Sequence, residues 1–366
     1  MMHRLQAAIL ALIGLALASL GGCASGTPAE PSTQPSDPPA AWPEPVDAVS
    51  LQRAGPENPA PQVALDLAVL VFDTGLEDLA ADEVDTVFAE VRKAESLFMP
   101  VQLREALQQS GYWGVVRVLP ERSDSFALHV SGKIVHADGR DMVIDVAATD
   151  ASGREWLSRR YRGRAPASAY PVDGAAEPFA AVYHRIANDL AQALAQRQSA
   201  RLATLQDIAL MRFAARLAPT VFADYLERNE DGEWRLAGFP AESDSMLQRV
   251  RRLQRQENLF VDTVDEQYRG LIDEFAPTYH LWREYSRELV VYEEDYLARA
   301  SQREIQSRRG TFAAMQQTYN TFRRAKVHEQ DLYELASGFD NEVTATVVDV
   351  DDRVYRLRGS LQEQFV

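Results

Sequence analysis

Apolar residues after position 62 change their spacing in a fixed order, and this order constrains the fold more than any other feature of the chain. Alternating apolar residues predict a strand over 63–72. Helical spacing then predicts a helix before Pro100 that continues over 101–109 and ends at Gly111. Further strands are predicted over 115–119, 126–136, 142–149 and 156–162, and turns at 137–140 and 150–153 join the last three as two hairpins. A helix is predicted to follow over 177–196. A strand, a helix, four strands and a helix predict an α/β sandwich domain within an α+β chain.

Beyond position 200 the apolar spacing is helical, which predicts a mainly helical second domain. Helices are predicted from about 201 to 219, from Asp244 or Ser245 onward, from Asp262 onward, from Pro277 to about 308 and from 311 to 337, with a loop over 232–240. Alternating residues then predict a β-hairpin over 343–358. The predicted domains are therefore an α/β domain over 63–200 and a helical domain with this hairpin over 201–366. Ser360 to Glu363 have the form of a capping box, which predicts the start of a helix, but the sequence stops three residues later at Val366. A helix that short is marginal, so either the tail is disordered or the sequence is an incomplete version of a longer protein.

The first residues of the chain have the composition of an export signal. A short basic start is followed by an apolar stretch over 5–18, which is shorter than the roughly 20 residues of a membrane-spanning helix. Leu20-Gly21-Gly22-Cys23 resembles the lipobox of bacterial lipoproteins. The resemblance implies a signal peptide over 1–22 and a lipid anchor on Cys23, and the absence of Asp at position 24 implies the outer membrane, with the protein facing the periplasm. The alternative is an ordinary cleaved signal followed by a coincidental cysteine.

Residues 23–62 join this anchor to the predicted domains. They are rich in Pro, Ala, Ser and Thr, and such a segment cannot bury enough apolar surface to fold. An extended proline-rich chain at about 3.1 Å per residue would reach on the order of 100 Å. We therefore expect a mobile tether that ends at Gln62.

Charge and cysteine content exclude several classes of function. The formal net charge is −16, and an acidic chain lacks the basic footprint of a nucleic-acid-binding protein. Cys23 is the single cysteine, so no disulfide can form within the chain and no thiol remains for catalysis after acylation. No cofactor is predicted.

The histidines do not form a metal-binding or catalytic motif. Five lie beyond the signal, at positions 129, 136, 184, 280 and 328, without a His-Glu-x-x-His pattern or a pair at metal-ligand spacing. His129 and His136 are seven residues apart in one predicted strand, so we expect them on opposite faces of the sheet. Gly-x-Ser-x-Gly, Ser-x-x-Lys and phosphate-loop patterns are also absent from the sequence. The sequence therefore predicts neither a metal site nor a catalytic residue, and leaves dispersed carboxylates for any acid–base chemistry.

Residues 103–116, Leu-Arg-Glu-Ala-Leu-Gln-Gln-Ser-Gly-Tyr-Trp-Gly-Val-Val, resemble a step from helix through Ser-Gly-aromatic to strand in several periplasmic proteins. These proteins are the TolB amino-terminal domain, the lipoprotein activators of peptidoglycan synthases and the curli-secretion lipoproteins. Asp124, the stretch 130–134 and the turn 150–153 agree with the same pattern, so the resemblance covers roughly 63–197. It implies their α/β fold and a binding or assembly role without catalytic residues.

Aromatic residues mark the helix predicted after Pro277. Tyr285, Tyr292 and Tyr296 share one helical face, which makes them a candidate contact surface for a protein partner or a sugar ring, because tyrosine combines apolar area with a polar tip. Tyr279 and Trp282 belong to the same aromatic group, and the alternative is a helix packed in a bundle core, with the hydroxyls reaching its edge. A basic cluster is formed by Arg159, Arg160, Arg162 and Arg164; it either meets an anionic partner or pairs with nearby Asp and Glu.

Together these patterns predict a non-enzymatic, lipid-anchored module. It would use the membrane anchor at Cys23 and bind or regulate a protein of the cell envelope. The alternative is a hydrolase acting on carbohydrate or peptidoglycan, with its site between the two predicted domains.

Overall fold

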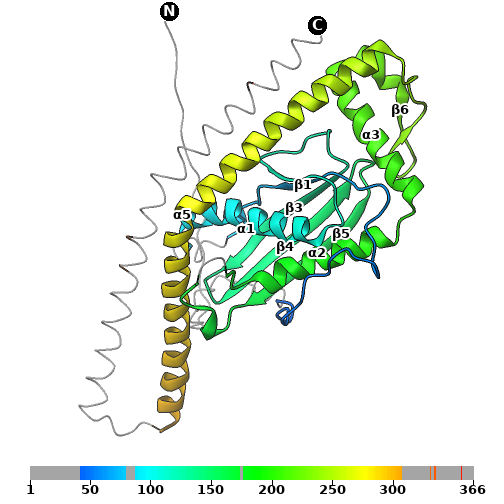
Figure 1. Cartoon of the computed structure of the whole chain (residues 1–366). Coiled ribbons are helices and arrows are strands. Elements are labelled where there is room, and N and C mark those ends of the chain that lie inside the picture. Colours follow the sequence, from blue (N-terminus) through cyan, green and yellow to red (C-terminus); the bar gives the residue numbers. More distant parts are fainter. Residues whose placement is uncertain are drawn as a thin grey trace, which may run out of the picture. The chain divides into compact units, whose positions relative to one another are not determined.

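The computed structural model describes residues 42–79, 87–173 and 176–306, together with Gln330, Glu334 and Arg356. Contacts within the chain group the described residues into one unit. The large sheet contains β1 (Leu67–Leu70), β2 (Val116–Leu119), β3 (Leu128–Ala137), β4 (Asp141–Asp150) and β5 (Glu155–Arg164). The helices are α1 (Ala89–Ser110), α2 (Ala180–Ala195), α3 (Ser199–Leu217), α4 (Pro219–Phe222) and α5 (Ser245–Gln306), and β6 (Leu226–Arg228) pairs with β7 (Trp234–Leu236). The protein is therefore a mixed α/β structure with a long helix after its sheet (Figure 1).

The five strands lie in the order β2-β1-β3-β4-β5. β1 runs parallel to both β2 and β3, whereas β3, β4 and β5 form an antiparallel meander. The parallel pair β1 and β2 needs a crossover, and α1 supplies it. The predicted strands and hairpins of this region are confirmed, with boundaries shifted by a few residues.

One face of the sheet is buried beneath helices. α1 packs on β1 and β2, α2 packs on β5, and the two helices lie side by side (Figure 1). The close fit of α2 depends on Gly163 in β5, where an added Cβ would lie 2.6 Å from the Val182 side chain and 2.9 Å from that of Phe179. The opposite face carries polar side chains at its surface, including Ser131 and Ser158.

Helix α1 passes through Pro100 without interruption, which explains why the two predicted helical stretches are one element. Proline has no N–H to donate to the carbonyl four residues earlier, which belongs to Ser96. Phe72, just after β1, donates its N–H to that Ser96 oxygen at 3.0 Å. The helix ends at Gly111, whose φ of 72° lies in the left-handed region, as the sequence predicts.

The expected tether is shorter than the sequence suggests, because residues 42–58 are bound to the folded body. Val46 donates its N–H to the Arg162 carbonyl of β5 at 2.7 Å. Asn188 of α2 donates to the Ser50 carbonyl at 3.0 Å and accepts the Gln52 N–H at 2.8 Å. Low hydrophobicity did not prevent ordering, since the segment uses backbone hydrogen bonds rather than a core of its own. We call residues 42–58 the strap.

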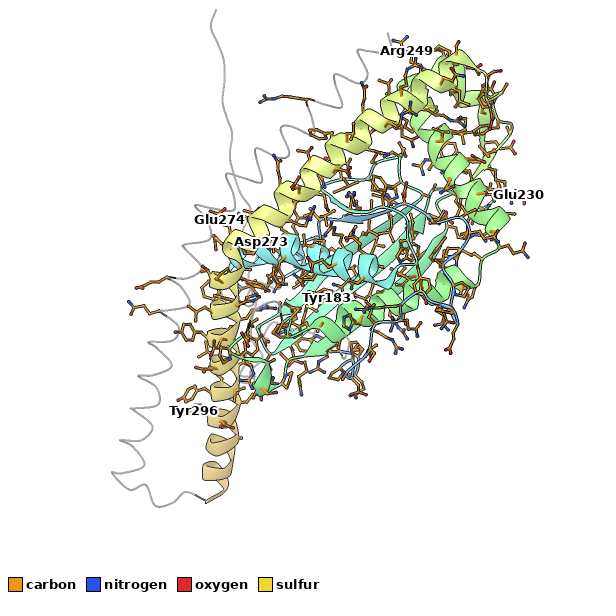
Figure 2. The ribbon with its side chains drawn as sticks, viewed as in Figure 1. Tyr183, Glu230, Arg249, Asp273, Glu274 and Tyr296 are labelled. Atoms are coloured by element: carbon orange, nitrogen blue, oxygen red, sulfur yellow. The ribbon has the colours of Figure 1, made fainter. Side chains whose placement is uncertain are left out.

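Helix α5 is one continuous element where the sequence predicts three helices. Asp244 caps its start, accepting the N–H groups of Met246 and Leu247 at 2.8 and 2.9 Å, as predicted. Asp262 is not a cap, and its side chain pairs with Arg117 instead. Pro277 lies inside the helix, and the helix bends near Asp273 and Glu274, as Figure 2 shows. Proline at that position removes the hydrogen bond to the Asp273 carbonyl, which accounts for the bend.

Some predicted elements cannot be compared with the structure. Cys23, the helix over 311–337 and the hairpin over 343–358 lie outside the described residues, apart from Gln330, Glu334 and Arg356, which are helical. The helical assignment at Arg356 does not fit the strand predicted there. The loop predicted over 232–240 contains β7, whose partner β6 precedes it. Three-residue strands are too short for an alternation pattern to reveal.

Candidate functional site

Buried polar residues between the sheet and α5 form the arrangement that most resembles a site. The hydroxyl of Ser123 donates to Glu257 Oε1 at 2.8 Å and lies 2.8 Å from the hydroxyl of Ser125. His129 Nε2 lies 2.8 Å from the Ser123 carbonyl oxygen. All four residues are buried. We call Ser123, Ser125, His129 and Glu257 the serine–glutamate cluster.

The geometry of this cluster does not provide a catalytic relay. The Ser123 hydroxyl has the Glu257 carboxylate within reach, but both side chains are buried and Glu257 also pairs with Arg216 at 3.3 Å. His129 contacts the Ser123 carbonyl and not its hydroxyl. The Nε2 atom must donate in that contact, and Nδ1, the atom left without a proton, has no hydrogen-bond partner. Burial, aided by the charge of Arg122, lowers the pKa of His129 to about 4, so its ring is neutral at neutral pH. His129 therefore holds the loop before β3 in place.

The β2 edge of the sheet is covered by carboxylates of α5. Asp265 accepts the Val118 N–H at 2.9 Å and forms a buried ion pair with Arg104 at 2.9 Å. One turn earlier, Asp262 pairs with Arg117 at 2.6 Å. The bond from Asp265 satisfies a strand N–H that an open edge would leave exposed, and the ion pairs hold α5 along this edge.

A small cavity lies beside this edge, lined by Asp66, Val115, Arg117, Ser125, Phe126, Asn258, Val261 and Asp262. Both of its carboxylates are engaged, since Asp66 accepts the Val115 N–H at 2.8 Å and Asp262 pairs with Arg117. The cavity therefore offers no carboxylate positioned for acid–base chemistry.

A second buried polar group joins the middle of α5 to α1 and to the segment before α2. Arg283 is only 2% exposed and forms two hydrogen bonds with Glu177, at 2.8 and 3.0 Å. Its guanidinium lies 4.6 Å from the ring centroid of Tyr279, whose hydroxyl donates to Glu95 at 3.1 Å. His280 completes the group, with Nδ1 2.6 Å from Arg283 Nη2. We call these five residues the arginine junction.

Electrostatics in the arginine junction follow from burial and pairing. Burial opposes the charge on Arg283, but the Glu177 carboxylate overcomes it and raises the pKa of Arg283. Burial raises the pKa of Glu95, although Arg92 at 3.3 Å acts in the opposite direction. Burial and the neighbouring charge of Arg283 lower the pKa of His280 to about 4. The junction fixes α5 on the α/β body, and its charged side chains interact with other residues inside the junction.

The structure separates the aromatic residues of α5 into two groups. Tyr279 and Trp282 belong to the core, where they pack against α1, as the bundle-core alternative expects. Tyr285 packs against the edge of this core. Tyr292 and Tyr296 lie further along α5, with their rings stacked at 6.5 Å, and Tyr296 is 44% exposed (Figure 2).

The arginines of β5 pair with nearby aspartates, which is the local pairing expected from the sequence as the alternative to an anionic partner. Arg160 forms two hydrogen bonds of 2.7 Å with Asp145, and Arg162 and Arg164 both reach Asp141. Burial opposes ionisation of Asp141, but the hydrogen bonds from Arg164 and Arg162 lower its pKa.

The expectation that His129 and His136 lie on opposite faces is wrong. A bulge between Ile134 and His136 changes the register of β3, so these histidines pair with Thr149 and Val143 of β4. Those two partners are six residues apart, which places both histidines on the same face of the sheet. His136 packs there against Trp42 of the strap, with ring centroids 4.6 Å apart.

Sequence reasoning missed the residues that join α5 to the body, although a signal for them exists. Glu257, Asp265 and Arg283 fall on the apolar side of α5, among Val261, Val264, Tyr268, Ile272 and Tyr279. A charged residue on the buried stripe of an amphipathic helix needs a buried partner. The pattern predicts that a partner exists, but its identity depends on the tertiary structure.

Comparison of the chain with protein-family models, curated proteins and solved structures found no match to any of them. Within the described residues, no group of three or more His, Cys, Asp and Glu side chains is placed to hold a metal ion. None of the helices in the described part of the chain has the length and apolar composition needed to cross a bilayer. The resemblance to periplasmic envelope proteins stays a prediction.

Proposed function

We propose that this protein is a non-enzymatic lipoprotein of the outer membrane that faces the periplasm. It would be anchored through Cys23 and would bind or regulate a protein of the cell envelope. The lipobox-like sequence before Cys23 and the resemblance over 63–197 support this proposal. The helical region with the hairpin over 343–358 belongs to the same proposal as a second part of the binding module.

The strap is the structural observation that carries the proposal. Because residues 42–58 are bound to the body, only the segment 24–41 separates the anchor from Trp42. At about 3.1 Å per residue, a proline-rich segment of this length reaches roughly 60 Å. A tethered module needs such a defined attachment point, because the attachment sets the distance at which its partner can be met.

The polar clusters under α5 agree with a binding role. In both clusters the charged side chains are engaged in contacts that join one element to another. The one hydroxyl–carboxylate pair of the serine–glutamate cluster, Ser123 with Glu257, is buried, and Glu257 also pairs with Arg216. They explain how the body is held together. The hydrolase alternative stays a prediction.

The proposal is tested first by labelling cells with radioactive palmitate and fractionating their membranes. We expect label in the intact protein and none in Cys23→Ala, with the intact protein in the outer membrane. An Ala24→Asp variant should move to the inner membrane. Unlabelled protein, or labelled Cys23→Ala, would overturn the anchor.

The partner role is tested by crosslinking in intact cells. Deleting ten residues from 24–41 shortens the reach by roughly 30 Å and should abolish any crosslinked partner. A chain with the same segment scrambled at constant length is the matched control and should keep it. A partner that crosslinks equally well to both chains would refute a distance-setting tether.

A further inference from the structure

The distal half of α5 carries a stripe of apolar side chains that the α/β body covers only in part: Tyr285 and Leu289 pack against the edge of the core, whereas Leu281 and Tyr296 are exposed. The stripe consists of Leu281, Tyr285, Leu289, Tyr292 and Tyr296, spaced at intervals of three and four residues. Leu281 is 40% exposed and Tyr296 is 44% exposed, which is unusual for large apolar residues repeated on one helix face. Such a face is typical of a helix that packs against another helix.

A neighbouring ion pair shows where this stripe points. Glu294 Oε2 lies 2.5 Å from Arg140, in the turn between β3 and β4, so this side of α5 faces the α/β body. Tyr292 is two residues before Glu294 and Tyr296 is two residues after it. At 3.6 residues per turn, each lies about 200° around the helix from Glu294. The two stacked tyrosines therefore face away from the body.

We propose that the segment 311–337 of this chain folds back antiparallel to α5 and covers the stripe. α5 ends at Gln306, and the predicted helix begins at Thr311, which leaves a connection of the length that joins antiparallel helix neighbours. A helix over 311–337 is about 40 Å long, enough to run back beside the whole stripe. Its apolar residues recur at matching intervals: Phe312, Met315, Tyr319, Phe322, Ala325, Leu332 and Ala336.

The two described residues of this segment agree with that orientation. Gln330 and Glu334 are helical and exposed, and Gln330 Nε2 donates to Glu334 Oε1 at 3.4 Å. They mark a polar side of the helix. Leu332 lies about 200° from Gln330 on a helix, on the side that would meet α5.

Charge also favours the antiparallel arrangement. A turn centred between Gln306 and Thr311 places Tyr292 opposite Ala325 and Tyr285 opposite Leu332. The acidic run over 293–295 then lies beside the basic run over 323–326, and opposite charges on adjacent helices stabilise their pairing. A second copy of α5 in parallel register would instead bring the acidic run against itself.

A segment of the same chain also reaches a higher effective concentration beside the stripe than a separate partner does. A short connection gives an effective concentration in the millimolar range. The three tyrosines predicted to contact a partner are thereby assigned to an internal contact. This inference is independent of lipidation and of the proposed function.

Cysteine crosslinking in the full chain tests the inference, because Cys23→Ala leaves no other cysteine. In that background, Tyr292→Cys with Ala325→Cys should oxidise to a disulfide within one chain. Tyr292→Cys with Val327→Cys is the matched control, since position 327 lies about 200° from 325 on a helix. We expect at least tenfold more crosslinked monomer from the first pair, identified by the linked peptides.

Each other outcome overturns the inference. Tyr292→Cys alone forming disulfide-linked dimers would show that a second copy occupies the stripe. Equal or absent crosslinking in the two pairs would show that segment 311–337 does not cover it. Hydrogen exchange of the Cys23→Ala chain without further substitution guards against disturbed folding: amides over 311–337 should be protected, and rapid exchange throughout them would also refute the contact.

Discussion

Burial of His129 should make the stability of this protein fall in mild acid. The ring is 6% exposed, and its pKa is lowered to about 4, whereas a histidine in the unfolded chain has a pKa near 6.5. The folded state therefore binds fewer protons than the unfolded state between these values. A lowered histidine pKa contributes stability that is present above pH 6.5 and is lost as the pH falls toward 4.

The size of this loss follows from the two pKa values. At pH 5 almost all unfolded chains carry the proton and few folded chains do, which costs about 2 kcal/mol relative to neutral pH. Urea denaturation at pH 7 and pH 5 measures the free energy of unfolding. We expect His129→Gln to lose about 2 kcal/mol less than the wild-type protein between these pH values, because glutamine does not titrate.

A control in the same cluster separates titration from simple weakening of the fold. Ser125→Ala removes a hydroxyl that lies 2.8 Å from Ser123 but removes no titrating group. Its acid loss should match that of the wild-type protein. If His129→Gln shows the wild-type loss to within about 0.5 kcal/mol, the usual error of additivity, then His129 is not held neutral by burial and the reasoning is refuted.

Three further substitutions test other parts of the fold. Glu177→Gln leaves the Arg283 guanidinium buried without its counterion and should lower the free energy of unfolding in urea by about 3 kcal/mol. The double variant Glu177→Leu with Arg283→Met should recover most of this stability, and an equal loss in both variants would contradict the pairing. Gly111→Ala should cost roughly 1 kcal/mol, because its φ of 72° disfavours a side chain while its surroundings leave room for one. Asn188→Ala should speed protease cleavage within 42–58, and Arg185→Ala, which loses a half-exposed ion pair, should not; equal rates would mean that Asn188 does not hold the strap.

The order of strands and helices over 63–196 could be predicted because each element buries one face, and the spacing of its apolar residues in the sequence shows whether it is a strand or a helix. The pairing of the strands was harder to predict from the sequence. The sequence predicts two hairpins, but the parallel position of β1 between β2 and β3 depends on contacts between distant residues. The bulge before His136 is a local change of register without a composition signal, and it reversed the predicted face of that histidine.

The candidate sites show the same division. The sequence contains the basic residues of β5 and the aromatic residues of α5, and acidic neighbours made local pairing a reasonable prediction. It does not reveal that Arg283 meets Glu177 or that Glu257 meets Ser123, because these pairs are more than one hundred residues apart. Burial decides their chemistry, and burial is a property of the packed molecule.

The sequence by itself determined the elements of each layer: a sheet, two helices over it and a series of amphipathic helices after it. These features follow from hydrophobic period and from turn residues, which act locally. Only the tertiary structure decided that the segment 42–58 is part of the body and that the helices predicted after Asp244 are a single one. Backbone hydrogen bonds to distant elements order the strap, and packing of α5 on α1 and β2 outweighs the helix-breaking tendency of Pro277.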